Sequence, residues 1–202
     1  MGSTIRRTAL GLVMCMGLAA CEFTVPVQGF SLFSPDAVRR ISVLDGWGQV
    51  RAPRGYCVSP QASKPEDGFV TLAPCTIVAG TGNPPTLEGL ITIQVGHPAS
   101  AIVTGREDAM LAYLQTEEGL EVIADRSGLS AIGGQVNDNV VEVLLEQGLS
   151  TNISGVNDHE WRAFFDRQDR LVTIAVRPFA NRPISDSEAL ELLRTATSRV
   201  QG

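Results

Sequence analysis

Residues 161–176 read WRAFFDRQDRLVTIAV and hold two runs of β-branched and aromatic residues on either side of a short polar segment. The first run, Trp161 to Phe165, and the second, Leu171 to Val176, each have the length and composition of a strand. The polar residues 166–170 between them are typical of a hairpin loop. The sequence therefore predicts an antiparallel pair of strands here.

Other strands and two helices are predicted around this hairpin. Apolar alternation and turn residues mark the strands, and S/T-x-x-E capping boxes mark the helix starts. The predicted strands are 56–58, 69–72, 90–95, 120–124 and 140–145, and the predicted helices are 104–116 and 185–200. This order lacks regular βαβ alternation, so we expect an α+β fold. Its sheet is largely antiparallel, with an internal helix and a C-terminal amphipathic helix packed on it.

Length and charge restrict the organisation and the partners. With 202 residues, 44% hydrophobic and 19% charged, the chain suits one globular domain and is too short for two independent cores. The formal net charge is −6, and no block of Lys and Arg could neutralise a row of phosphates. We therefore expect no nucleic-acid partner.

The N-terminus has the pattern of an export signal. Two arginines precede an apolar run over residues 9–20, which is shorter than the roughly 20 residues of a membrane-spanning helix. The run ends in Leu-Ala-Ala-Cys at positions 18–21, which resembles the lipobox of bacterial lipoproteins residue for residue. The resemblance implies that residues 1–20 are a lipoprotein signal peptide and that Cys21 is lipidated. The alternative is an ordinary secretory signal with an incidental Cys21.

The same resemblance implies a place in the cell. Acyl chains on Cys21, such as palmitate, would anchor the chain in a bacterial membrane, facing the periplasm. Glu22 stands where the family's sorting rules place Asp to retain a lipoprotein in the inner membrane, so we expect the outer membrane. From Glu22 to about Pro35 the sequence has no sustained period. We interpret residues 21–40 as the lipidated N-terminus and tether, and residues 41–202 as a single periplasmic domain.

The remaining cysteines form a candidate disulfide. Cys15 would leave with the signal and Cys21 would be acylated, so Cys57 and Cys75 remain in an oxidising compartment. A disulfide between them would stabilise the fold by about 3 kcal/mol. The alternatives to a structural disulfide are a redox-active pair and a metal site. The spacing is not C-x-x-C, and only two histidines could serve as further metal ligands.

Motifs for catalysis are incomplete. The segment from His159 to Ala163 reads HEWRA, which begins like the zinc-protease signature H-E-x-x-H but lacks its second imidazole. A hydrolytic triad would have to use His97 or His159. Trp47 and Trp161 could line a pocket or a partner surface, although core packing is favoured for both. We expect no catalytic, cofactor-binding or metal-binding residue, and no cofactor.

A second resemblance covers the domain. The segments GYCV at 55–58, FVTL at 69–72, Cys75, WRAF at 161–164 and RLVTIAV at 170–176 resemble small uncharacterised lipoproteins of alphaproteobacteria. That family has no established activity, so the resemblance implies no catalytic residue. We expect a non-catalytic binding or envelope-associated domain, with an envelope protein as partner. The alternative is a cell-envelope hydrolase with an unrecognised active site.

Overall fold

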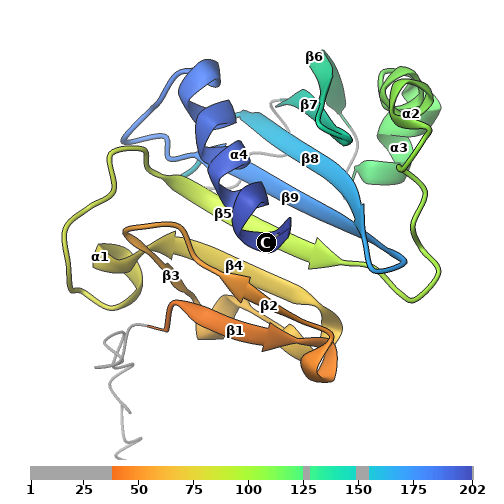
Figure 1. The fold of residues 1–202 in the computed structure, drawn as a ribbon. Coiled ribbons are helices and arrows are strands. Elements are labelled where there is room, and N and C mark those ends of the chain that lie inside the picture. The colour runs from red at the N-terminus through yellow and green to blue at the C-terminus, as the bar shows by residue number, and fades with distance from the viewer. Residues whose placement is uncertain (1–37, 125–127, 149–154, 202) are drawn as a thin grey trace, which may run out of the picture. The chain divides into compact units, whose positions relative to one another are not determined.

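The computed structural model describes residues 38–124, 128–148 and 155–201. Seven strands form one antiparallel sheet in the order β3-β4-β5-β9-β8-β7-β6 (Figure 1). They are β3 (Tyr56–Val58), β4 (Phe69–Pro74), β5 (Gly89–Val95), β6 (Leu129–Asn137), β7 (Val140–Gln147), β8 (His159–Arg167) and β9 (Arg170–Pro178). A second sheet pairs β1 (Arg40–Val43) with β2 (Gly48–Arg51).

Four helices accompany the sheets in the described ranges. They are α1 (Cys75–Val78), α2 (Glu107–Leu114), α3 (Glu117–Ile123) and α4 (Asp186–Gln201). Short 3-10 turns lie at η1 (Leu44–Gly46), η2 (Pro60–Ala62) and η3 (Pro65–Asp67). The described part of the chain is therefore α+β with a large antiparallel sheet and a C-terminal helix on it, which confirms the predicted fold class.

The predicted hairpin is β8 and β9, and it lies in the sheet between β7 and β5. Trp161 pairs with Val176 and Arg167 pairs with Arg170, so the register runs along both strands without interruption. Gln168 and Asp169 form the two-residue turn, and both have positive φ. That geometry matches the twist of the flanking strands, as in a type I′ turn. The hairpin prediction is confirmed.

Helix α4 packs on one face of the sheet (Figure 1). Its capping box is present, because the Ser185 N–H donates to Glu188 Oε2 at 2.8 Å and the Glu188 N–H donates to Ser185 Oγ at 3.3 Å. The predicted amphipathic helix is confirmed, and the buried stripe consists of Ala189, Leu192, Leu193, Ala196 and Val200. The sheet supplies β-branched and leucine side chains from β4, β5 and β9 to this core.

Helices α2 and α3 pack on the other face, over β6 and β7. The predicted strand at 120–124 is wrong, because residues 117–123 form α3. Thr116 caps this helix by accepting the Gly119 N–H on Oγ1 at 3.1 Å. Gly119 is needed at the junction with α2, since a Cβ there would lie 2.0 Å from the Tyr113 carbonyl oxygen.

Strand β6 was not predicted. Gly133 and Gly134 interrupt its sequence pattern and favour a loop, yet they lie inside the strand. Gly134 allows α2 to lie close to β6, because a Cβ there would be 2.6 Å from Leu111 Cδ1. Packing against the helix therefore outweighs the low strand propensity of the two glycines.

Helix α2 begins at Glu107, later than the predicted start at residue 104. The N–H groups of Ile102, Val103 and Thr104 instead donate to the Asp166 carboxylate at 2.7–3.0 Å. Asp166 belongs to the β8–β9 hairpin. Residue 104, which the local pattern assigned to the helix, is therefore held by a long-range contact instead.

Candidate functional site

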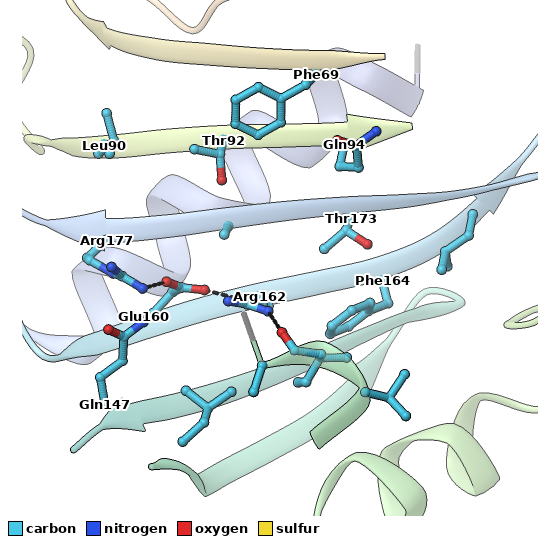
Figure 2. Close-up of a pocket in the computed structure, with 16 residues that line it drawn as sticks. Phe69, Leu90, Thr92, Gln94, Gln147, Glu160, Arg162, Phe164, Thr173 and Arg177 are labelled. Atoms are coloured by element: carbon cyan, nitrogen blue, oxygen red, sulfur yellow. Dashed lines mark hydrogen bonds and ion pairs between the residues drawn. The ribbon is translucent and has the colours of Figure 1, made fainter. Parts of the chain in front are cut away.

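A groove lies on the part of the sheet's second face that α2 and α3 leave uncovered. Strands β5, β9 and β8 form its floor, and residues of β4 and the end of α3 add to its lining (Figure 2). Its volume is about 570 Å³, which falls in the range of small-molecule sites, roughly 300–1,000 Å³. We therefore take this groove as the candidate binding site.

Short side chains hollow out the middle of the groove. The sheet register places Ala175 of β9 between Thr92 of β5 and Arg162 of β8. The centre of that row is therefore a methyl group. In the next row, Thr173 lies between two longer side chains of the same neighbouring strands. A groove results because the central strand carries its smallest residues where a packed sheet would carry large ones.

Three charged side chains form one end of the groove. Both oxygens of the Glu160 carboxylate accept hydrogen bonds, Oε1 from Arg162 Nε and Oε2 from Arg177 Nη2 (Figure 2). Arg162 Nη1 also donates to the Ile123 carbonyl oxygen at 2.6 Å, which ties the floor to the end of α3. The side chains of Glu160 and Arg177 are only 5% and 8% exposed. Two guanidinium groups and one carboxylate give this cluster a formal charge of +1.

The guanidinium of Arg177 has N–H donors that are not paired with an acceptor among the described residues. Glu160 is its hydrogen-bonding partner, and within the described residues its Nε is buried without an acceptor. An unpaired buried donor costs about 1–3 kcal/mol, and more when the group is charged. Buried polar groups are nearly always paired with protein, water or ligand. This donor therefore marks the charged end of the groove as the place where a further acceptor would bind.

The rest of the lining is polar in the middle and apolar at the other end. The hydroxyls of Thr92 and Thr173 have no hydrogen-bonding partner among the described residues. Phe164 and Leu171 line the far end, and Val122 of α3 stands at its edge with 71% of its surface exposed. The groove is thus amphipathic, with a cationic end, free hydroxyls and an apolar end.

A second cavity, of about 990 Å³, lies between α4 and residues 82–87. Tyr56 is buried beside it, and its hydroxyl donates to the Leu87 carbonyl oxygen at 2.8 Å and accepts the Gly89 N–H at 3.0 Å. Burial raises the pKa of the Tyr56 phenol well above its ordinary value. Its polar group is already satisfied by the chain, so Tyr56 serves to hold the loop.

The two histidines are not brought together. His97 follows β5, near the turn of the β8–β9 hairpin, whereas His159 begins β8 at the opposite end of that hairpin. His159 Nδ1 lies 3.0 Å from Asp186 Oδ1, and Nε2 lies 3.7 Å from Glu146 Oε1. The hydrogen bond to Asp186, opposed by partial burial and aided by the charges of Asp186 and Glu146, raises the pKa of His159.

This arrangement does not form a hydrolytic triad. A triad needs a hydroxyl or thiol on the second ring nitrogen of His159, and that nitrogen faces Glu146. The nearby Ser185 Oγ donates to Glu188 as part of the helix cap. His159 therefore links β8 to the start of α4.

The two tryptophans serve different parts of the core. Trp161 is buried under α4, and its Nε1 donates to the Asp186 carbonyl oxygen at 2.8 Å. Trp47 is partly buried at the edge of the same core. The guanidinium carbons of Arg167 and Arg170 lie 5.6 and 5.8 Å from its ring centre, within cation–π range. Neither tryptophan lines the groove.

Cys57 and Cys75 are joined by a disulfide, which links β3 to the first residue of α1. Cys21, the signal at 1–20 and most of the tether at 21–40 fall outside the described residues. Within the described ranges, no cluster of three or more His, Cys, Asp or Glu could hold a metal ion. The helices in those ranges include none with the length and apolar character needed to cross a membrane.

The groove residues were not predicted from the sequence, although a signal for them exists. In the predicted strands 90–95 and 171–176, Thr92, Gln94, Thr173 and Ala175 alternate with large apolar residues. Small or polar residues on one face of two strands indicate that this face is not packed in a core. The pairing of the two strands could not be known, so the sequence alone could not place these residues together.

Comparisons with known proteins do not identify a family. No protein-family model matches the chain, and no curated protein matches it. Two solved structures show a distant similarity to this chain. A point mutant of the protein Mog1 is 12% identical with a TM-score of 0.43, and the match covers 80% of this chain and 88% of that chain. The Saccharomyces cerevisiae Ran-binding protein Mog1p is 12% identical with a TM-score of 0.44, and the match covers 81% and 84%.

Proposed function

We propose that this chain is a lipid-anchored protein of the bacterial envelope whose domain binds a ligand in the sheet-face groove without converting it. The observation that carries the proposal is the hollow over Ala175 with the incompletely paired Arg177 at one end. Hollow, charge and free hydroxyls together favour a binding site. The resemblance to uncharacterised alphaproteobacterial lipoproteins agrees with such a role.

Binding is favoured over hydrolysis by the surroundings of the imidazoles. His159 has a carboxylate at each ring nitrogen, and His97 is exposed in the loop after β5. Neither histidine lines the groove. A hydrolase would need a base and a nucleophile at its substrate pocket.

Photo-crosslinking tests the groove as a binding site. The lipidated full chain in membranes is exposed to a library of photoreactive fragments of mixed charge, and labelled peptides are mapped by mass spectrometry. We expect labelling on β5, β8 and β9, and its loss in Ala175→Trp, which fills the hollow. Ile77→Trp, at an exposed position on α1, is the matched control and should label as the wild type does. Labelling that avoids these strands, or that persists in Ala175→Trp, would overturn the proposal.

Metabolic labelling tests the anchor. The wild-type chain should incorporate radiolabelled palmitate and sediment with the outer membrane, and Cys21→Ser should incorporate none. Glu22→Asp should keep the label but shift the protein toward the inner membrane. A Cys21→Ser chain that still carries palmitate would exclude lipidation at this residue.

A further inference from the structure

We propose that the groove selects an amphipathic carboxylate: a ligand with one carboxylate group and an apolar body. This inference rests on the proposed binding function and adds the chemical class of the ligand. Three independent properties of the groove support it: its charge, its unused donors and the position of its apolar surface.

The charge favours an anion. Glu160 is shared by two guanidinium groups, so one positive charge in the cluster is not balanced by these three side chains. An unbalanced charge is costly in a site with so little exposure to water. A ligand carboxylate would complete the balance, whereas a cationic ligand would add to the unpaired charge.

The donors favour a carboxylate. Arg162 is held in place, because its Nε and Nη1 donate to Glu160 and to the Ile123 carbonyl oxygen. Among the residues that the structure describes, Arg177 donates to Glu160 alone. Guanidinium groups bind carboxylates with two parallel hydrogen bonds. Arg177 has donors that Glu160 does not use, and these could bind a ligand carboxylate. The hydroxyls of Thr92 and Thr173 could donate to the same group or to a polar atom beside it.

The apolar end favours a ligand with a hydrophobic body. Phe164 and Leu171 line the groove beyond the charged cluster. The exposed Val122 of α3 adds apolar surface at the edge. Each methylene group of a ligand that is buried in the groove contributes favourable free energy of binding. A chain of several methylene groups would therefore add affinity that acetate or inorganic phosphate cannot gain.

Equilibrium dialysis with matched probes tests this proposal. The lipidated full chain is placed in phosphatidylcholine nanodiscs, with empty nanodiscs as the reference for partitioning into lipid. The probes are hexanoate, hexanol, hexylamine, acetate and inorganic phosphate. We expect hexanoate to bind about tenfold more tightly than hexanol, because a hydrogen bond between two charged groups is stronger than one between a charged and a neutral group. Hexylamine should bind least, and acetate and phosphate should bind more weakly than hexanoate.

Two variants and one control assign the effect to the groove. Arg177→Gln keeps the Glu160–Arg162 pair and should reduce hexanoate binding to the level of hexanol. Ala175→Leu leaves all charges unchanged and should weaken hexanoate and hexanol together. Arg182→Gln removes an arginine that pairs with Glu88 and does not line the groove, so it should bind as the wild type does. If Arg177→Gln does not fold, the probe series and Ala175→Leu still decide the question.

The outcomes separate the two proposals. Equal binding of hexanoate and hexanol, or unchanged binding in Arg177→Gln, would overturn carboxylate selection while fragment labelling of the groove could still support a binding site. Phosphate binding as tight as hexanoate binding would reduce the site to a general anion site and overturn the need for an apolar body. Absence of groove labelling by any fragment would overturn the binding function itself.

Discussion

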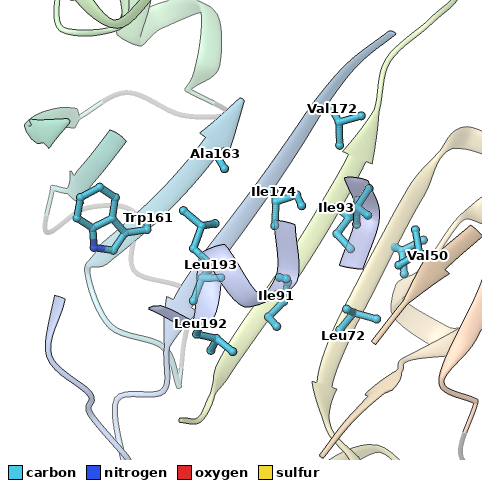
Figure 3. Close-up of a cluster of buried hydrophobic side chains, with 14 of the residues drawn as sticks. Val50, Leu72, Ile91, Ile93, Trp161, Ala163, Val172, Ile174, Leu192 and Leu193 are labelled. Atoms are coloured by element: carbon cyan, nitrogen blue, oxygen red, sulfur yellow. The ribbon is translucent and has the colours of Figure 1, made fainter. Parts of the chain in front are cut away.

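The two faces of the seven-stranded sheet are built from the same strands but differ in what they carry. Toward α4, strands β5 and β9 carry Ile91, Ile93, Val172 and Ile174, all buried (Figure 3). Toward the groove, the intervening residues are small or polar (Figure 2). Because successive side chains on a strand point to opposite faces, neighbouring residues have different tasks. Along β5 and β9, one face therefore packs in the core under α4, and the other is left available for a ligand.

The two faces differ because helices cover them to different extents. The sixteen-residue α4 runs across β8, β9 and β5, so its face is closed. The shorter α2 and α3 pack on β6 and β7 on the other face and do not extend over β5 and β9. An uncovered half-face of a sheet remains stable only if its residues tolerate water, and Thr92, Gln94 and Thr173 do.

The largest expected effect comes from adjacent residues on opposite faces. Ile174→Ala should lower the free energy of unfolding by about 2–5 kcal/mol, because it leaves a cavity under α4. Thr173→Ala, one residue earlier and in the groove, should change it by less than about 0.5 kcal/mol. Urea unfolding of both variants measures the difference. Similar losses in the two variants would show that the groove face is packed like the other.

Removing the disulfide tests how the groove side of the β3 edge is held. Tyr56 and Val58 belong to the core under α4, so alternation places Cys57 on the opposite side of β3. The double variant Cys57→Ala/Cys75→Ala should lose about 3 kcal/mol, from the entropy of an 18-residue loop in the unfolded chain. Unfolding of the wild type with and without reductant should reproduce the loss. No change on reduction would mean that packing alone holds this edge.

A smaller effect is expected at the start of α4. Ser185→Ala removes the side-chain acceptor of the capping box and should cost about 1 kcal/mol in the free energy of unfolding. Ser198→Ala is the matched control, since this exposed serine near the end of α4 donates its hydroxyl hydrogen bond to the Thr195 carbonyl oxygen and caps no helix start. Equal denaturation midpoints for the two variants would argue that the packed face does not depend on this cap.

The smallest expected effect is a pH dependence at the junction of β8 and α4. The pKa of His159 is raised in the folded chain, mainly by the hydrogen bond to Asp186. Its contribution to stability is therefore complete below the ordinary value of about 6.5 and is lost as the pH rises through the raised value. Relative to His159→Gln, the wild type should be more stable at pH 5.5 than at pH 9, as urea unfolding would show. A difference that does not vary with pH would refute this.

The elements that the sequence predicts well are those whose local pattern agrees with their packing. Hairpin β8–β9 and helix α4 carry their own turn residues or cap, so local rules suffice. Strand β6 and helix α3 could not be predicted in this way. Gly133 and Gly134 favour a loop until α2 lies against them, and the apolar run 120–124 suits a strand until Thr116 caps a helix before it. Their structures depend on neighbours that the local pattern does not contain.

The candidate site depends even more on long-range pairing. Glu160, Arg162 and Arg177 come from two strands, and only the β8–β9 register brings their charges together. Within the sequence, Glu160 belonged to an incomplete zinc-protease motif, whereas in the structure its carboxylate holds two arginines. The sequence contains the chemistry of the groove but not its arrangement.

The order of strands in the sheet also determines the order in which the strands can pair during synthesis. Strand β5 pairs with β4 on one side and with β9 on the other, and β6, β7 and β8 come between β5 and β9 in the chain. During synthesis from the N-terminus, β3, β4 and β5 are therefore complete long before β9, the second partner of β5, is made. Until then the β5 edge is open to pairing with other chains. We expect folding to be slow and to finish with the closing of this seam, so the half-made protein is the form that most needs protection from aggregation.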